Sequence, residues 1–106
     1  MGMHNYRELK IWQRSMGEER YGLTAQIRDC AVSVPGNISE GAGRGTNKQF
    51  KRFLEFSMGS INEAQTQIEL AHRLKYLAKE IYDVIIDEAL QIYKMILAFY
   101  NSLKDE

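Results

Sequence analysis

The segment ERYGLTAQIRDCAVSVPGNISEGAGRG, residues 19–45, decides the fold of this chain. Its apolar residues recur at spacings of three and four, as in an amphipathic helix, at Leu23, Ile27, Cys30, Ala31, Val34 and Ile38. Pro35 lies inside this pattern, where it removes one backbone hydrogen bond and costs about 3 kcal/mol in a plain helix. Because the pattern continues on both sides of the proline, the sequence predicts a kinked helix that wraps around a neighbouring helix or subunit.

Length and composition predict a single domain over residues 1–106. The chain has 106 residues and a mass of 12.3 kDa, enough for one hydrophobic core, and its 44% apolar residues argue against disorder. No apolar run reaches the roughly 18 residues that cross a membrane, and the charged start MGMHNYRELK lacks the apolar stretch of a secretory signal. The single Cys30 is expected to be a buried small hydrophobe rather than a reactive thiol. These features predict a cytoplasmic protein.

The sequence leaves little room for strands, because it has one proline and few glycines outside residues 36–45. We therefore expect an all-α fold with four helices, over residues 5–16, 18–42, 47–77 and 79–103. Gly17 is expected to end the first helix, and Thr46 with Gln49 forms a capping box before the third. The residues expected on the inward face of the third helix are Phe50, Phe53, Leu54, Ile61, Ala64, Ile68 and Ala71. The third and fourth helices should be antiparallel neighbours, since the turn between them is very short.

The predicted fourth helix carries two apolar stripes, although its own bundle needs only one. The first stripe consists of Ile81, Ile85, Ile92, Met95, Phe99 and Leu103. The second consists of Tyr82, Ile86, Ala89, Tyr93, Leu97 and Tyr100. One interpretation is a wide core-facing surface with the tyrosine hydroxyls at its margin. The other, which we expect, is that the second stripe forms an oligomer interface through Tyr82, Ile86, Tyr93, Leu97 and Tyr100.

No motif in the chain predicts catalysis, a metal or an organic cofactor. Glu69 and His72 have the Glu-x-x-His spacing of di-iron bundles, but the second such pair and the two further glutamates are missing. The glycines of residues 36–45 do not form a phosphate-binding loop, because Ala42 follows Gly41 where the lysine belongs. Ser33, Ser57 and Ser60 have no histidine that the sequence places to activate them. We expect a protein that is not an enzyme.

A basic block lies where the predicted third helix begins, and we expect it to be the nucleic-acid site. It consists of Arg44, Lys48, Lys51 and Arg52, with no acidic residue before Glu55. Cations at a helix N-terminus suit phosphate contacts. Arg7, Lys10 and Arg14 are secondary candidates at spacings that place them on one side of the first helix. The alternative is an ordinary solvated helix face, and the balance of 14 basic and 14 acidic residues argues against strong non-specific binding.

Several segments occur in the order found in one bacterial family. They are YRELKIWQ, the run from Glu19 to Arg44, FKRFLEFSMGSINEAQTQIELA and YLAKEIYD. Together they resemble the four-helix-bundle proteins encoded in intervening sequences of 23S ribosomal RNA genes, a family that includes accessory variability proteins of diversity-generating retroelements. The resemblance implies a left-handed, antiparallel up-down-up-down bundle and a barrel-like homopentamer. In the retroelement branch it also implies a basic barrel that engages a reverse transcriptase and RNA.

The chain departs from that family pattern in two respects. Its first helix is only about 18 Å long, against about 45 Å for the third, so the expected fold is a four-helix bundle with a shortened first helix and a Pro-kinked second helix. Its neutral net charge differs from the strongly basic retroelement branch. Two functions follow from these observations. One is a non-catalytic homo-oligomer that binds RNA or DNA through basic faces, and the other is an oligomeric scaffold or adaptor without nucleic-acid binding.

Overall fold

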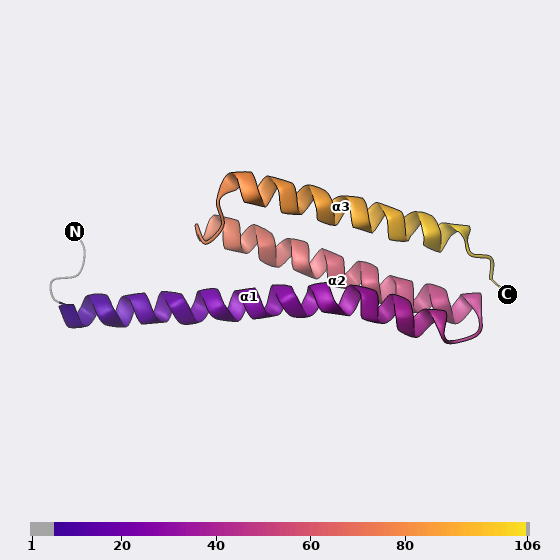
Figure 1. Ribbon diagram of the computed structural model, residues 1–106, viewed down its shortest axis with the longest axis horizontal. Coiled ribbons are helices and arrows are strands. Elements are labelled where there is room, and N and C mark those ends of the chain that lie inside the picture. The colour runs from indigo at the N-terminus through magenta and orange to yellow at the C-terminus, as the bar shows by residue number, and fades with distance from the viewer. Residues whose placement is uncertain (1–5, 106) are drawn as a thin grey trace.

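The fold of the described residues is all-α, as the sequence predicts, but they form three helices where four were expected. A computed structural model describes the backbone of residues 6–105 and the side chains of residues 20–105. Within these residues the chain forms α1 (Tyr6–Ala42), α2 (Asn47–Arg73) and α3 (Lys79–Ser102), and no strand (Figure 1).

The prediction of separate first and second helices is wrong, because α1 runs without interruption through both of the expected segments. Gly17 lies inside α1 rather than at a helix end, and Glu18 and Glu19 are interior as well. A glycine inside a helix costs only about 1 kcal/mol relative to alanine, whereas a break would leave backbone groups unpaired at two new helix ends. Pro35 also lies within α1, so the four-helix bundle with a Pro-kinked second helix is replaced by a three-helix arrangement with one long helix.

The two later helices lie close to where the sequence predicts them. Thr46 caps α2, because its side-chain Oγ1 accepts a hydrogen bond from the backbone N–H of Gln49 at 3.2 Å. The helix ends at Arg73, earlier than expected, and the chain turns through Lys75, which has a left-handed φ of 65°. Ala78 precedes α3 and offers no side-chain hydrogen bond to its first turn.

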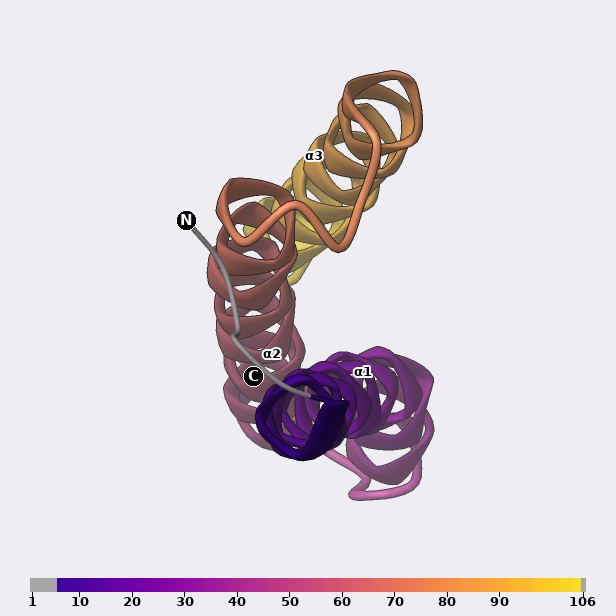
Figure 2. The same ribbon diagram turned by 90° about the vertical axis from the view of Figure 1, so that its left-hand side faces the viewer.

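The helices form an open, elongated arrangement with α2 in the middle. α1 packs on one flank of α2 and α3 on the other, and α2 runs antiparallel to both (Figures 1 and 2). Among the described residues, no Cα atom of α1 comes within 8 Å of a Cα atom of α3. The molecule measures 67 × 24 × 13 Å, so much of each outer helix has no helical neighbour on one side.

The best-packed core lies toward the turn that joins α1 to α2, which we call the closed end. Leu54, Met58, Ile61 and Ile96 are buried there, with side chains from all three helices around them. Ser57 is fully buried beside them and donates a hydrogen bond from its Oγ to the carbonyl oxygen of Val34 at 2.8 Å. Burial of Leu54, Ile61, Ile68 and Ala71 confirms most of the predicted inner face of α2.

Gly41 permits close approach of α1 and α2 at the closed end. A Cβ atom at this position would lie 2.7 Å from Cβ of Phe53, so no other residue fits without moving a helix. This contact explains why the turn between the two helices can be short.

The opposite end of the molecule, where α2 turns into α3, is the open end. There the guanidinium of Arg20 donates a hydrogen bond to the carbonyl oxygen of Tyr76, beyond the last residue of α2. Residues 6–19 of α1 therefore extend past both other helices, as Figure 1 shows. We call residues 6–19 the overhang.

Candidate functional site

The structure brings the four residues of the predicted basic block together at the closed end. Arg44 lies in the turn after α1, and Lys48, Lys51 and Arg52 lie in the first turns of α2. Arg44, Lys48 and Arg52 are exposed, whereas Lys51 is half-buried. The block thus forms a cationic region across the start of α2.

Two arginines of the block lie against phenylalanine rings and form what we call the Arg–Phe cluster, consisting of Arg44, Arg52, Phe53 and Phe56. The guanidinium of Arg44 lies 4.8 Å from the centre of the Phe53 ring, and that of Arg52 lies 5.7 Å from the centre of the Phe56 ring. The two rings meet edge to face at 5.4 Å. Phe56 remains 45% exposed, so an aromatic surface lies between two cations.

The predicted site contains the two arginines of this cluster but neither phenylalanine, because Phe53 is expected on the inner face of the helix and Phe56 belongs to no predicted site. A usable signal was present, because Arg52 precedes Phe56 by four residues and side chains at that spacing meet on a helix.

The charges of the block are partly neutralised. Glu40 forms an ion pair with Arg44 at 2.7 Å, and Asp105 forms one with Lys51 at 3.2 Å. Lys51 also lies 4.7 Å from the centre of the Tyr100 ring. Lys48, by contrast, makes no such contact with any described residue, so its ammonium group is available to a ligand.

The secondary candidates Arg7, Lys10 and Arg14 lie on the overhang, and their side chains are outside the described residues. From Arg14 to Ala42, α1 rises about 42 Å at 1.5 Å per residue. The structure therefore does not unite these residues with the basic block, and their role in binding stays a prediction.

The second stripe of α3 lies largely against α2. Tyr82 stacks on His72 with a distance of 4.4 Å between ring centres, and Tyr93 and Tyr100 pack against the buried core. The Tyr100 hydroxyl donates a hydrogen bond to Glu55 at 2.7 Å, and this bond to a carboxylate raises the pKa of Tyr100. Ile86 lines a shallow depression beside Thr66 and Glu69, and Leu97 is 37% exposed. An oligomer interface formed by these residues stays a prediction.

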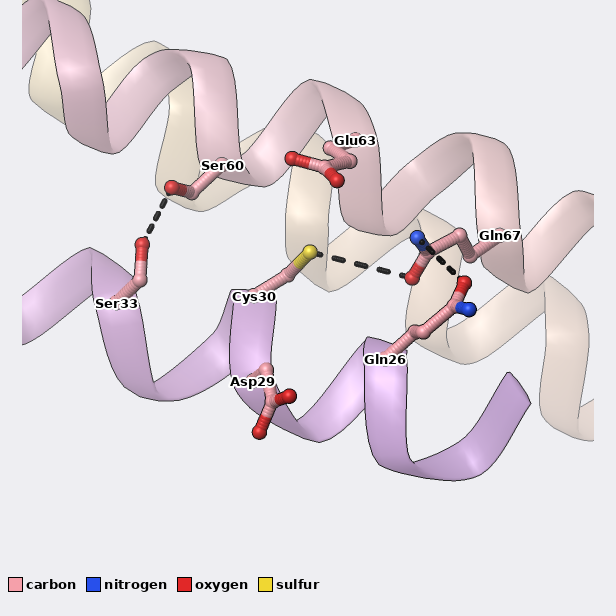
Figure 3. A pocket seen from close by; sticks show the side chains of 7 residues that line it. All are labelled: Gln26, Asp29, Cys30, Ser33, Ser60, Glu63 and Gln67. Atoms are coloured by element: carbon pink, nitrogen blue, oxygen red, sulfur yellow. Dashed lines mark hydrogen bonds between the residues drawn. The ribbon is translucent and has the colours of Figure 1, made fainter. Parts of the chain in front are cut away.

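A polar cavity of about 470 Å³ lies between α1 and α2 and contains the single cysteine (Figure 3). The Cys30 thiol donates a long hydrogen bond to Gln67, with 3.9 Å between sulfur and oxygen, and Gln67 in turn donates to Gln26 at 3.2 Å. Burial raises the pKa of Cys30, and the nearby carboxylates of Glu63 and Asp29 raise it further. Cys30 is buried, as predicted, and its surroundings oppose formation of the nucleophilic thiolate.

The Glu-x-x-His pair is engaged in other contacts. Glu69 forms an ion pair with Arg73 at 2.8 Å. The Nδ1 atom of His72 lies 3.1 Å from the carbonyl oxygen of Leu77. In the part of the chain whose side chains are described, no three His, Cys, Asp or Glu residues come together in a way that would hold a metal ion.

Comparison with protein families identifies a family to which the chain is similar. The family of 23S rRNA-intervening sequence proteins matches residues 7–98 of the chain, which covers all three helices except the ends of α1 and α3. No curated protein matches the chain. None of the helices, as far as they are described, is long and apolar enough to cross a membrane.

Proposed function

The chain belongs to the family of 23S rRNA-intervening sequence proteins, and we propose that it acts as a non-catalytic, homo-oligomeric module that binds nucleic acid. The binding surface in this proposal is the basic block at the closed end, and the contacts are to the phosphate backbone. Single-stranded RNA is the form of nucleic acid that suits this surface best, because the surface combines cations with an exposed aromatic ring.

The observation that carries the proposal is the Arg–Phe cluster. A guanidinium that lies on an aromatic ring can still donate hydrogen bonds to phosphate oxygens from its N–H edge. Arg44 already donates one such bond to Glu40, whereas Arg52 makes no ion pair with a described residue. Between Arg44 and Arg52, the exposed ring of Phe56 offers a surface on which an unpaired base can stack. Stacking on aromatic rings beside cations is a common mode of single-strand recognition.

Oligomerisation strengthens this weak surface in the proposal. One copy offers four cations, two of them already paired with carboxylates, so its affinity alone is modest. A symmetric assembly repeats the surface and lets several weak contacts act together on one strand. The family resemblance suggests five subunits, and a reverse transcriptase as partner if the chain belongs to the retroelement branch.

The chemistry around Cys30 supports a function without catalysis. A nucleophilic cysteine needs a lowered pKa, whereas burial and two carboxylates raise the pKa of this one. The carboxylates of Glu63 and Asp29 also lie apart from the basic block, so they do not form a common site with it.

The test is an anisotropy titration with labelled single-stranded and hairpin RNA at low salt. Replacement of Lys48, Lys51 and Arg52 by glutamate should abolish binding. A control with the same change of charge replaces the exposed Arg73, Lys75 and Lys94, which lie outside the block, and should retain most of the affinity. The logarithm of the affinity should fall with the logarithm of salt concentration with a slope of about 3 for four phosphate contacts on a single strand.

The alternative function, a scaffold or adaptor without nucleic-acid binding, is favoured by the exposed apolar side chains of α3. Met95 is 70% exposed and Val84 is 56% exposed, which is unusual for residues of this kind. If neither single-stranded nor hairpin RNA binds at low salt, the scaffold function is favoured over the nucleic-acid function. The same conclusion follows if RNA binds equally well to the block variant and to the control variant.

A further inference from the structure

An apolar groove runs along the molecule between α1 and α3, with α2 as its floor (Figure 2). One part of it has a volume of about 350 Å³, and all of its lining residues except Glu88 are apolar. A second part of about 160 Å³ continues the groove to the open end. Along α1 the groove extends from Arg20 to Pro35, about 22 Å at 1.5 Å per residue, which is the length of a helix of about four turns.

The α3 side of the groove carries a row of exposed residues. Ile92 lines the groove and is 46% exposed, and Ile81, on the same stripe toward the open end, is 53% exposed. Glu88 lies between them and forms no ion pair or hydrogen bond with a described residue. We call Ile81, Glu88 and Ile92 the α3 row. Its two apolar side chains and one unpaired carboxylate suit a partner that supplies apolar side chains and a cation.

The outer edge of α1 offers this combination. Tyr21 is 77% exposed and Val32 is 66% exposed, and their separation of eleven residues places them on the same side of the helix. Arg28 lies between them on that side, is exposed and forms no ion pair with a described residue. Cys30, on the other side of α1, faces α2. We call Tyr21, Arg28 and Val32 the α1 ridge.

The α1 ridge and the α3 row have the same spacing. In each of them the charged residue follows one apolar residue by seven positions and precedes the other by four. Two such helices that lie side by side and parallel therefore bring Arg28 against Glu88. The apolar pairs then meet about 10 Å before and about 6 Å after this ion pair. Apolar contact and opposite charge thus coincide in one register.

The direction of the neighbouring helix follows from the lining of the groove. In the antiparallel direction, with the two charges still opposed, Tyr21 would meet Met95 and Val32 would meet Val84. Met95 and Val84 line neither part of the groove, whereas Ile92 lines it. The parallel direction therefore places the α1 ridge inside the groove, and the antiparallel direction leaves it on the outer rim.

We propose that the α1 ridge of a neighbouring copy occupies this groove, parallel to α3, and that this contact builds the homo-oligomer. The contact is heterologous, because ridge and groove are different surfaces of the same chain and every copy uses both. Such contacts form a ring when the rotation between neighbours closes. The number of subunits is set by that rotation, and a ring of five is compatible with the contact.

This inference rests on the homo-oligomer of the proposed function and names the two surfaces that build it. It assigns the interface to the first stripe of α3, through Ile81 and Ile92, whereas the sequence favours the second stripe. Copies related by rotation about an axis along the helices all point in the same direction, so their basic blocks lie at one end of the ring. A single strand of RNA can then contact several blocks in turn.

The first test exchanges the charges of the two surfaces and measures the mass by light scattering on a size-exclusion column. Arg28→Glu or Glu88→Arg alone sets like charges against each other and should raise the concentration at which half of the chains are assembled by about tenfold or more. The double variant restores opposite charges and should assemble as the unchanged chain does. The control is Lys94→Glu, at an exposed cation outside the groove, which should not change assembly.

The outcomes separate this inference from the proposed function. A mass near 12.3 kDa for the unchanged chain overturns both, since no homo-oligomer then exists. A mass of two subunits overturns the inference, because a heterologous contact leaves a free groove in a pair and continues to further copies. A larger oligomer that neither charge variant weakens, or that the double variant fails to restore, overturns this interface and leaves the homo-oligomer of the proposed function in place.

The second test is disulfide formation in a Cys30→Ser background. A chain with both Val32→Cys and Ile92→Cys should form disulfides between neighbours on mild oxidation, so that a denaturing gel shows a ladder of linked chains. A disulfide within one chain is excluded, because it needs Cα atoms closer than about 7 Å, and among the described residues no Cα atom of α1 lies within 8 Å of one of α3. The control pairs Val32→Cys with Val84→Cys, its antiparallel neighbour. The proposal is overturned unless the first pair gives the stronger ladder.

The third test compares two valines. Val32→Glu places a carboxylate on the α1 ridge and should disperse the oligomer without loss of helicity by circular dichroism. Val84→Glu makes the same change at a residue that is 56% exposed but lies outside the groove, and should leave the oligomer intact. If Val84→Glu disperses the oligomer as strongly as Val32→Glu does, or if Val32→Glu leaves it intact, the assignment of the α1 ridge to the groove is wrong.

Discussion

The closed end and the open end of this molecule differ in how closely their helices pack and in how their helix ends are capped. At the closed end, Gly41 brings α1 against α2, Thr46 caps α2, and Leu54 is fully buried. The ring of Phe50 also meets that of Phe99 edge to face at 5.3 Å, which joins α2 to α3. At the open end, α1 continues past its partners and α3 begins without a side-chain cap.

The difference indicates that the two ends differ in rigidity and in exposed apolar surface. Residues at the closed end pack against and hydrogen-bond to one another within a single chain. This end is therefore a rigid support for the cations at the start of α2. At the open end α1 extends beyond the other two helices, and apolar side chains of α3 such as Ile81 and Val84 are exposed. The free energy of unfolding should therefore respond strongly to substitutions in the buried core of the closed end and weakly to those at exposed apolar residues of α3.

The largest effect is expected from Leu54→Ala. Leu54 has no exposed surface, so its truncation leaves a cavity and should lower the free energy of unfolding by about 2–5 kcal/mol. The matched change Met95→Ala removes a side chain that is 70% exposed and should cost less than about 0.5 kcal/mol. Urea denaturation at low protein concentration measures both, and equal losses would contradict the contrast between the buried core and the exposed apolar side chains of α3.

A second pair of substitutions compares two glycines of α1. Gly41→Ala places a Cβ atom 2.7 Å from Cβ of Phe53, and separation of the helices should cost about 1–3 kcal/mol. Gly36→Ala meets no atom within 4 Å and should stabilise the helix by about 0.5–1 kcal/mol. Thermal unfolding should move in opposite directions for the two variants, and a loss for both would mean that helix packing at Gly41 is not the cause.

The sequence predicts the later part of this fold better than its beginning. The periodic pattern and the Thr46 capping box locate α2, and the short turn correctly predicts an antiparallel α3, because these signals are local. The prediction that Gly17 ends a helix is wrong, because glycine occurs both at helix ends and inside helices, and its identity alone does not distinguish the two.

The candidate site was predicted in outline from charge alone. The four cations of the basic block do lie together, because they are close in sequence around one turn. Two of these cations are paired with carboxylates, and only the pair of Arg44 with Glu40 could be predicted from the sequence, because Glu40 precedes Arg44 by four residues. Asp105 is distant in sequence and reaches Lys51 only because α3 returns to the closed end. Residue spacing likewise does not determine which of the two stripes of α3 faces α2, because that depends on how the helices pack.

The N-terminal residues of α2 and α3 provide a third comparison, with a smaller expected effect. Thr46→Ala removes a hydrogen bond to the backbone N–H of Gln49 and should cost about 1 kcal/mol. Ala78→Ser supplies the missing cap at a residue with extended backbone and should add about 0.5–1 kcal/mol. Amide hydrogen exchange resolves both changes, since protection should fall in the first turn of α2 and rise in the first turn of α3. A uniform change across the molecule would contradict a local capping effect.

The smallest effect concerns Cys30, which lies between the two ends. Its pKa is raised above the ordinary value of 9.0, chiefly by burial, so the folded chain favours the protonated thiol. This contribution to stability is fully present below the pKa of the unfolded chain and is lost as pH rises through the higher folded value. Alkylation by iodoacetamide at pH 8 should therefore be slower in the folded chain than in urea, and its rate should rise only at more alkaline pH. If the folded and unfolded chains react equally fast at pH 8, the packing between α1 and α2 is open at Cys30, and the tight contact is confined to the closed end.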